Sequence, residues 1–201
     1  MDGLTELLLK MEHYALENKI PIIQREAGTI LTKIVKEQAP HSILEIGTAI
    51  GYSTLLMAAN LPSDGQIITI ELDHERAATA SRFLSESSFT HNVQVLAGNA
   101  GSLINDLPGP FDFVFLDAAK GQYPDYLEKV TAKLSDGAWI VADNVLFRGL
   151  VLQSANTPRR FRTIVKRLQN YLYTVTQDSR FDTTLYRIGD GLAVTQFHKE
   201  K

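Results

Sequence analysis

The sequence contains no cysteine, and none of its apolar runs approaches the length of a membrane span. The first absence excludes disulfides, iron–sulfur clusters, thiolate zinc sites and cysteine nucleophiles. The second excludes a transmembrane helix, which needs about 20 consecutive apolar residues. The first residues also lack the basic start and apolar run of a secretory signal. We therefore expect a cytoplasmic protein that does not span a membrane.

Acidic residues are missing from one long stretch, although the chain as a whole has a net charge of -3. Between Asn144 and Gln177 there is no Asp or Glu, so the stretch is strongly basic on an otherwise acidic protein. A local positive surface of this kind suits a polyanionic ligand that binds at one place. The basic residues are Arg148, Arg159, Arg160, Arg162, Lys166 and Arg167.

The hydrophobic pattern predicts an α/β fold. With 201 residues, of which 44% are hydrophobic, the chain is expected to be one domain over residues 1–201, with N-terminal helices over 1–40 and the core over 41–201. Strands alternating with helices indicate a parallel sheet with helices on both faces. Short apolar runs at 43–46, 66–70, 93–96, 111–116 and 138–142 alternate with helical patterns at 53–60, 74–87, 100–107 and 123–134.

The C-terminal part has a different pattern. A helix is predicted from about residue 158 to residue 173, and two β-rich runs follow at 181–188 and 192–197. Gly189-Asp190-Gly191 separates these runs, as expected for the turn of a hairpin. The parallel sheet is therefore expected to carry one antiparallel strand at its end.

Two glycines, Gly47 and Gly51, follow the first predicted strand and precede a helix that Ser53 or Thr54 is expected to cap. The simplest interpretation is a plain strand-to-helix turn. The other is a ligand-binding turn at which the backbone approaches a small molecule closely. The spacing does not match the dinucleotide-binding pattern of glycines, which disfavours nicotinamide and flavin dinucleotides.

Two carboxylates favour the second interpretation. Glu45 precedes the glycine turn, where it suits a cationic amino group better than a phosphate, and Glu71 ends the second strand, where it can accept hydrogen bonds from ribose hydroxyls. A ligand with a ribose, an ammonium group and no phosphate is S-adenosylmethionine.

Oxygen ligands follow the fourth and fifth predicted strands. Asp117 follows one strand, and Asp143 and Asn144 follow the other, so all three are expected at the carboxyl edge of the sheet. Three such donors suit Mg²⁺, with water and substrate oxygens completing its shell. The alternative is that these side chains only cap the next turn.

The run Glu45-Ile46-Gly47-Thr48, continued by Gly51-Tyr52-Ser53-Thr54, resembles the cofactor loop of the cation-dependent O-methyltransferases of catechol and caffeoyl-CoA type. The similarity extends over about residues 21–196. It implies a Rossmann-like seven-stranded sheet in the order 3-2-1-4-5-7-6, with strand 7 antiparallel, and a homodimer. The chain has Gly98-Asn99-Ala100 where that family commonly has Gly-Asp-Ala. The resemblance implies cofactor contacts from Ile23, Glu45, Gly47, Ser53, Glu71, Asn99, Ala100 and Asp117.

The same resemblance implies that Asp117, Asp143 and Asn144 bind the divalent cation, and that Lys120, with Asp117, is catalytic. Lys120 would act on the substrate hydroxyl, either as a general base or by stabilising the oxyanion. The alternative for Lys120 is a solvated surface amine.

The runs from Asp143 to Val151 and from Pro158 to Leu168, together with Gly189–Leu192, resemble the bacterial tRNA 5-hydroxyuridine methyltransferases. This implies that the enzyme makes 5-methoxyuridine at the wobble position of the anticodon loop, and that the six basic residues contact RNA. A 5-hydroxyl beside the 4-carbonyl resembles the oxygen pair of a catechol. Two alternatives stay open: a methyltransferase of small catechol-like or hydroxycinnamoyl-ester substrates, and a non-catalytic module that binds the cofactor or RNA.

Overall fold

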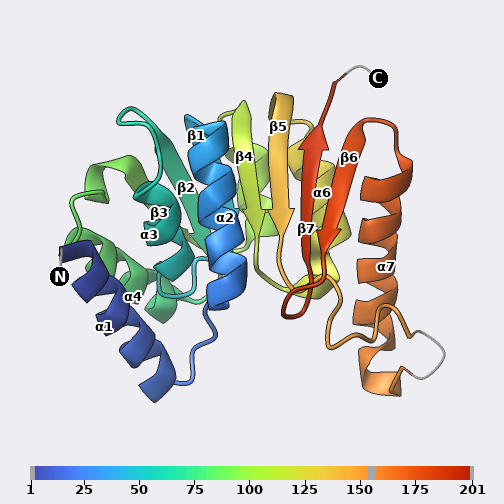
Figure 1. The fold of residues 1–201 in the computed structure, drawn as a ribbon, viewed down its shortest axis with the longest axis horizontal. Coiled ribbons are helices and arrows are strands. Elements are labelled where there is room, and N and C mark those ends of the chain that lie inside the picture. The colour runs from blue at the N-terminus through green and yellow to red at the C-terminus, as the bar shows by residue number, and fades with distance from the viewer. Residues whose placement is uncertain (1–2, 154–156, 200–201) are drawn as a thin grey trace. The chain divides into compact units, whose positions relative to one another are not determined.

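The computed structural model describes residues 3–153 and 157–199, and the chain divides into two compact units, one up to Ala100 and one from Gly101 onward. Seven strands follow the order β3-β2-β1-β4-β5-β7-β6, drawn in Figure 1. This order confirms the predicted α/β fold. The single domain over residues 1–201 stays a prediction. None of the helices in the described residues is long and apolar enough to cross a membrane.

The first unit contains three parallel strands. In β1 the side chains of Ile43, Leu44 and Ile46 are at most 1% exposed, as expected for a strand covered on both faces. β1 pairs with β2, and β2 pairs with β3. The elements are α1 (Gly3–Glu17), α2 (Arg25–Gln38), β1 (Ser42–Ile46), α3 (Tyr52–Ala58), β2 (Gln66–Glu71), α4 (His74–Ser85), η1 (Thr90–Asn92) and β3 (Val93–Ala97).

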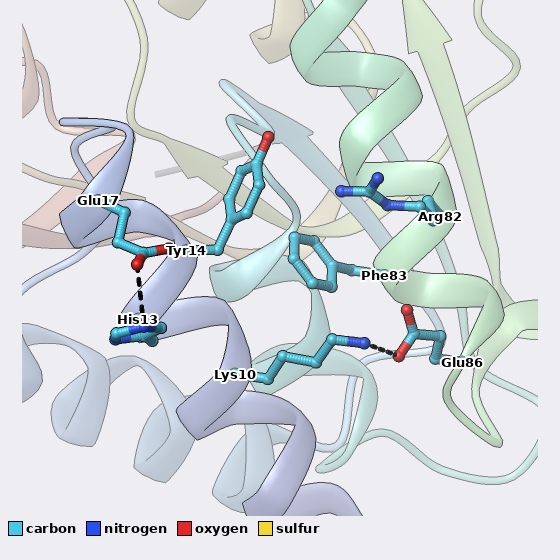
Figure 2. Close-up of a pocket in the computed structure, with 7 residues that line it drawn as sticks. All are labelled: Lys10, His13, Tyr14, Glu17, Arg82, Phe83 and Glu86. Carbon is cyan, nitrogen blue, oxygen red and sulfur yellow. Dashed lines mark hydrogen bonds and ion pairs between the residues drawn. The ribbon is translucent and has the colours of Figure 1, made fainter.

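A groove of about 390 Å³ lies between α1 and α4. Figure 2 shows the side chains that line it, where Lys10 forms an ion pair with Glu86 at 2.6 Å. The guanidinium of Arg82 lies over the rings of Tyr14 and Phe83, 5.8 and 5.3 Å from their centroids. These contacts link α1 to α4 and the residue that follows it, whereas His13 pairs with Glu17 within α1 itself.

The second unit contains a parallel pair, β4 and β5, followed by an antiparallel hairpin. Helix α7 packs against β6, and the two run side by side in Figure 1. The elements are α5 (Ala100–Asp106), which begins at the last residue of the first unit, β4 (Phe111–Leu116), η2 (Lys120–Gln122), α6 (Tyr123–Thr131), β5 (Leu134–Ala142), η4 (Arg159–Phe161), α7 (Arg162–Gln177), β6 (Phe181–Tyr186) and β7 (Leu192–Phe197).

Two predicted boundaries in this unit are wrong. β5 begins at Leu134, so the helix predicted to reach that residue ends at Thr131. The start of the strand does not have an apolar pattern, because Ser135 and Asp136 are polar and Gly137, with φ +77°, is atypical of a strand. α7 continues to Gln177 because Tyr171 and Val175 extend its buried face.

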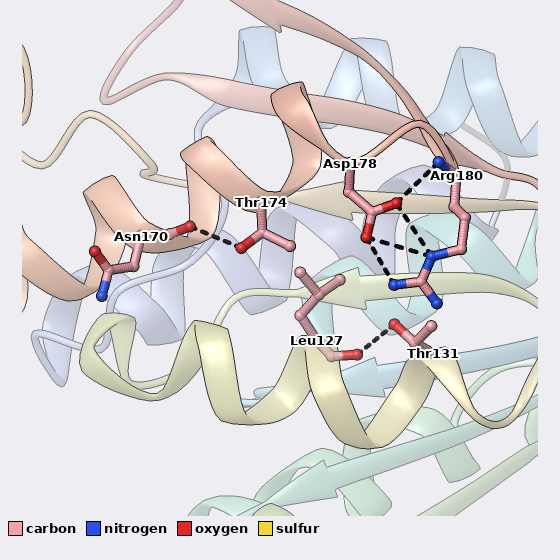
Figure 3. A network of polar contacts seen from close by, with 6 residues as sticks. All are labelled: Leu127, Thr131, Asn170, Thr174, Asp178 and Arg180. Carbon is pink, nitrogen blue, oxygen red and sulfur yellow. Dashed lines mark hydrogen bonds and ion pairs between the residues drawn. The ribbon is translucent and has the colours of Figure 1, made fainter.

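Local hydrogen bonds shape the helices of this unit and the turn after α7 (Figure 3). Within the helices, the hydroxyls of Thr131 and Thr174 donate to the carbonyl oxygens of Leu127 and Asn170, four residues earlier. After α7, the Asp178 carboxylate accepts from the backbone N–H and the guanidinium of Arg180, at 3.0 and 2.7 Å. The contacts between Asp178 and Arg180 lie in the short turn that joins α7 to β6.

The predicted hairpin turn is confirmed. The backbone N–H of Gly191 donates to the carbonyl of Ile188 at 2.8 Å. A Cβ on Gly191 would lie 2.4 Å from Cγ of Leu146, and its φ of +86° favours glycine. The turn therefore packs tightly against the segment that follows β5.

Candidate active site

The turn after β1 has a left-handed backbone at three positions. Gly47 has φ +103°, Ala49 +48° and Gly51 +86°. The N–H of Gly47 donates to the carbonyl of Ile70 at 2.9 Å, which holds the turn beside β2. The N-cap of α3 is Gly51, and no side chain caps the helix. The prediction that Ser53 or Thr54 caps α3 is therefore wrong.

Both of those hydroxyls donate instead to Glu45, whose side chain is fully buried. Ser53 Oγ donates to Oε1 of Glu45 at 2.6 Å, and Thr54 Oγ1 donates to Oε2. Thr69, in β2, also donates to Oε2 at 2.6 Å. The Glu45 carboxylate thus joins β1 to β2 and α3 and sets the shape of the glycine turn. Its predicted contact with a ligand amino group stays a prediction.

Glu71, at the end of β2, accepts one backbone N–H on each carboxylate oxygen. Oε2 accepts from Ala49 at 2.8 Å, and Oε1 accepts from Asp73 at 3.0 Å. A carboxylate oxygen accepts more than one hydrogen bond, so both oxygens retain capacity for a ribose hydroxyl. The next residue, Leu72, is 67% exposed, and this apolar surface beside Glu71 is a candidate ligand contact that the sequence pattern did not indicate.

The other predicted cofactor residues of the first unit lie in two places. The N–H of Gly98 donates to the carbonyl of Glu71 at 2.8 Å, which brings the segment with exposed Asn99 and buried Ala100 to the end of β2. Ile23 is buried in the segment between α1 and α2. The sequence-based assignment of Ile23 to the cofactor stays a prediction.

In the second unit, three predicted residues gather at the ends of β4 and β5. The Lys120 ammonium lies 2.5 Å from Oδ1 of Asp117, and both side chains are about one-fifth exposed, at 18% and 22%. The backbone N–H of Asp143 donates to the carbonyl of Leu116 at 2.9 Å, so Asp143 follows the β4–β5 pairing directly. Burial raises the pKa of Asp143 to about 6, and the nearby carboxylates of Asp117 and Asp190 act in the same direction.

Strained backbone follows Asp143. Asn144 has φ +56°, and its N–H donates to Oδ1 of Asp143 at 2.6 Å. Phe147 and Arg148 also have positive φ, at +42° and +58°. Such conformations persist only where the surroundings enforce them, and they cluster at functional sites.

The donor chemistry of this region fits a hard divalent cation. Asp143 and Asp117 are neighbouring carboxylates with mutual repulsion, which a cation would relieve, and the Asn144 side chain offers an amide oxygen. No three His, Cys, Asp or Glu side chains among residues 3–153 and 157–199 form a metal-ligating group. A cation here would therefore draw on the amide and on oxygens from outside the protein.

The six basic residues are all exposed, and none of them is in an ion pair in the part of the chain that the structure describes. Within α7, which carries Arg162, Lys166 and Arg167, the side chains of Val165 and Leu168 are buried. Residues 154–156 of the acid-free stretch lie outside the described residues.

Aromatic rings accompany two of these cations. The Arg148 guanidinium lies 5.7 Å from the ring centroid of Phe161, and that of Arg160 lies 4.6 Å from the same ring. Phe147 and Phe161 meet edge to face at 5.4 Å. We call Phe147, Arg148, Arg160 and Phe161 the aromatic–arginine cluster.

Solved structures share this fold. The O-methyltransferase TomG of Streptomyces achromogenes, crystallised with S-adenosylmethionine, is 28% identical with a TM-score of 0.86, over 96% of this chain and 90% of that one. An O-methyltransferase of Bacillus cereus, in complex with S-adenosylhomocysteine, is 26% identical with a TM-score of 0.86, over 98% of this chain and 91% of that one.

Curated relatives include a catechol O-methyltransferase of Niastella koreensis, 40% identical over 134 residues, or 65% of this chain and 61% of that protein. Tricin synthase 1 of rice is 30% identical over 84% of this chain and 71% of its own length. The O-methyltransferase family matches residues 3–197. The chain therefore belongs to the O-methyltransferase family.

Proposed function

We propose that this protein transfers a methyl group from S-adenosylmethionine to a hydroxyl with a second oxygen beside it, and that it needs a divalent cation such as Mg²⁺. The observation that carries the proposal is the pair of carboxylates at adjacent strand ends, in which burial and Asp117 raise the pKa of Asp143 to about 6. The proposed substrates are small catechol-like or hydroxycinnamoyl-ester compounds. The names of the relatives support this class, since they include a catechol and a caffeoyl-CoA O-methyltransferase.

The residues of the first unit are proposed to hold the methyl donor. S-adenosylmethionine supplies an electrophilic methyl group on a sulfonium. Glu71 would accept hydrogen bonds from the ribose, and Asn99 and Ala100 would lie beside the adenine. Glu45 and Ser53 would keep the glycine turn in shape, and Gly47 and Ile23 would complete the contacts. The TomG and Bacillus cereus structures, which are complexes with S-adenosylmethionine and with its demethylated product, support this assignment.

The residues of the second unit are proposed to hold the acceptor. A divalent cation held by Asp117, Asp143 and Asn144 would lower the pKa of a substrate hydroxyl and orient it. A cation on Asp117 would also compete with the Lys120 ammonium for the same carboxylate. Lys120, once released, would accept the hydroxyl proton if it is present as the neutral amine, a form that a neighbouring cation favours, or would stabilise the negative oxygen as the charged ammonium.

The test is a methyl-transfer assay with labelled S-adenosylmethionine and the purified chain. We expect 3,4-dihydroxyphenyl substrates to be methylated in the presence of Mg²⁺ and not in the presence of EDTA. Analogues with a single hydroxyl on the ring should react far more slowly. Equal rates on both substrate types, or no effect of EDTA, would contradict the proposal. If the donor binds and no hydroxyl compound or RNA is methylated, the chain is a non-catalytic binding module.

A second candidate substrate is the wobble 5-hydroxyuridine of tRNA, methylated to 5-methoxyuridine. The observation that favours it is the exposed basic stretch with its aromatic–arginine cluster, because cations bind phosphates and aromatic rings stack on unpaired bases. A wobble base lies in a single-stranded loop and enters a pocket without the opening of a duplex.

The same assay with tRNA that carries 5-hydroxyuridine distinguishes the two candidates. A turnover rate on tRNA far above that on dihydroxyphenyl compounds would make RNA the substrate, and the reverse would exclude it. In cells, deletion of the gene is expected to cause 5-hydroxyuridine to accumulate in tRNA only if tRNA is the substrate. We also propose a cytoplasmic homodimer, which light scattering tests for oligomeric state and cell fractionation tests for location.

A further inference from the structure

One buried hydroxyl lies between the two strand ends that carry the proposed cation ligands. Oη of Tyr123 is 2.9 Å from the carbonyl oxygen of Leu116 and 2.9 Å from that of Asp143. The Tyr123 side chain is fully buried. A phenol has one proton, so this hydroxyl donates to both carbonyls in a shared hydrogen bond.

One of these carbonyls belongs to a proposed cation ligand, and the other belongs to the residue directly before one. Leu116 ends β4 and immediately precedes Asp117, while Asp143 is itself a proposed ligand. The paired register of β4 and β5 ends at Leu116 and Ala142, just before these residues. One backbone hydrogen bond, from the N–H of Asp143 to the carbonyl of Leu116, joins the two strands beyond this register, and Tyr123 adds a second link at the same place.

The ring of Tyr123 makes a further contact with the same region. The Lys120 ammonium lies 5.6 Å from its centroid, within the range of a cation–π interaction. Burial raises the pKa of the Tyr123 phenol well above its usual value, and the carboxylates of Asp117 and Asp143 act in the same direction. The phenol therefore stays protonated and keeps its role as a donor.

We propose that Tyr123 is a positioning residue for the divalent cation: its hydroxyl holds the backbones of Asp117 and Asp143 at the spacing that the cation requires. The proposal rests on the cation site of the proposed function. Groups that orient metal ligands from outside the ligand shell typically contribute about 10-fold or more to metal affinity.

Tyr171 provides a matched control. It lies in α7 with its ring 5.5 Å from that of Tyr123, and it is also fully buried. Its hydroxyl has no hydrogen-bond partner among the described residues. Tyr171→Phe and Tyr123→Phe remove the same atom from neighbouring buried rings, but only the second removes a link to the proposed ligands.

The experiment titrates Mn²⁺ into the full-length protein by electron paramagnetic resonance, without methyl donor or substrate. We expect Tyr123→Phe to weaken Mn²⁺ binding about 10-fold and Tyr171→Phe to leave it within about twofold of the wild type. The increase in Tm on adding Mg²⁺ is the second measurement, taken relative to each metal-free variant so that a general loss of stability cancels. In turnover, Tyr123→Phe is expected to raise the KM for Mg²⁺ and to recover its kcat at saturating Mg²⁺.

The outcomes separate this inference from the function on which it rests. If the wild type binds no Mn²⁺, the cation site of the proposed function is wrong. If the wild type binds Mn²⁺ and Tyr123→Phe binds it equally well, the role of Tyr123 is overturned. An equal loss in Tyr123→Phe and Tyr171→Phe also overturns it, because that result reflects packing of the two rings alone.

Discussion

The ammonium nitrogen of Lys120 lies 2.5 Å from Oδ1 of Asp117, three residues earlier in the chain. The short helix η2 begins at Lys120 and turns the lysine back toward the end of β4. The proposed catalytic amine thus contacts the carboxylate that is also the first proposed cation ligand. A bound cation and the lysine would compete for it, and this competition makes the two roles separable by mutation.

Replacement of Lys120 is expected to abolish turnover without lowering the affinity of the protein for the cation. Lys120→Ala removes the group that acts on the hydroxyl proton, which is typically worth about 10²–10⁴-fold in rate. It also removes the competitor for Asp117, so Mn²⁺ affinity should hold or rise. Lys129→Ala, which breaks a 2.9 Å ion pair with Asp125 in α6, is the control and should change neither quantity. A loss of Mn²⁺ affinity in Lys120→Ala would contradict the proposed competition.

Asp143→Ala is expected to abolish cation-dependent methyl transfer and leave the affinity for S-adenosylmethionine largely unchanged. The physical reason is the division of roles, since Asp143 belongs to the cation set and the donor is assigned to other residues. Isothermal titration with each ligand measures the two affinities. Asp125→Ala, at a half-buried position of α6, serves as the control. Equal loss of both affinities in Asp143→Ala would disprove the division.

The stability of the metal-free protein is expected to fall as the pH rises through the range of Asp143. Its folded pKa of about 6 lies above the ordinary value of 3.8, so the folded state binds the proton more tightly than the unfolded state. The contribution of Asp143 to the free energy of unfolding is then largest below about pH 4 and decreases up to about pH 6, by on the order of 3 kcal/mol. Asp143→Asn should flatten this part of the profile in chemical denaturation.

The same ionisation predicts how the cation stabilises the protein. Protons and cations compete for Asp143, so Mg²⁺ should raise Tm more above pH 6 than below it. Thermal melts at about one pH unit on either side of that value, with and without Mg²⁺, measure the difference. An equal shift at both pH values would mean that Mg²⁺ binds elsewhere.

Glu45→Gln is expected to destabilise the fold by about 1–3 kcal/mol, because Ser53 and Thr69 donate to different carboxylate oxygens and the amide nitrogen that replaces one of these oxygens cannot accept a hydrogen bond. The glycine turn should loosen as well, with weaker binding of the methyl donor. Urea denaturation and donor titration measure the two effects. Glu37→Gln, at an exposed position of α2, is the matched control and should alter neither.

The tRNA candidate predicts a charge effect at the start of α7. Arg159→Glu combined with Arg162→Glu should weaken tRNA binding and reduce its dependence on salt, because fewer phosphates are neutralised. Filter binding over a series of salt concentrations measures both. The control reverses two exposed basic residues of the first unit, Lys33→Glu and Lys36→Glu. If the Arg159 and Arg162 changes do not reduce tRNA affinity, the small-molecule substrates are favoured.

The order of the strands and the positions of most elements followed from local pattern and from the family resemblance. β4, Phe111–Leu116, matches its predicted run because a strand covered on both faces is almost continuously apolar. β5 was shortened in the prediction because Ser135, Asp136 and Gly137 are polar or flexible. The predicted N-cap of α3 is wrong, since the local sequence does not show that the hydroxyls of Ser53 and Thr54 both donate hydrogen bonds to Glu45.

The amino-acid sequence by itself determined which chemistry is available to this protein: acids at the ends of strands, a glycine turn without a dinucleotide pattern, and a stretch with cations alone. Those properties depend on residue type and spacing along the chain. The folded chain was needed to show that the hydroxyl of Tyr123 bridges Leu116 and Asp143, and that Asp143 is buried near Asp117. Such contacts join residues that are distant in sequence, and their energies depend on burial and distance, which no local pattern specifies.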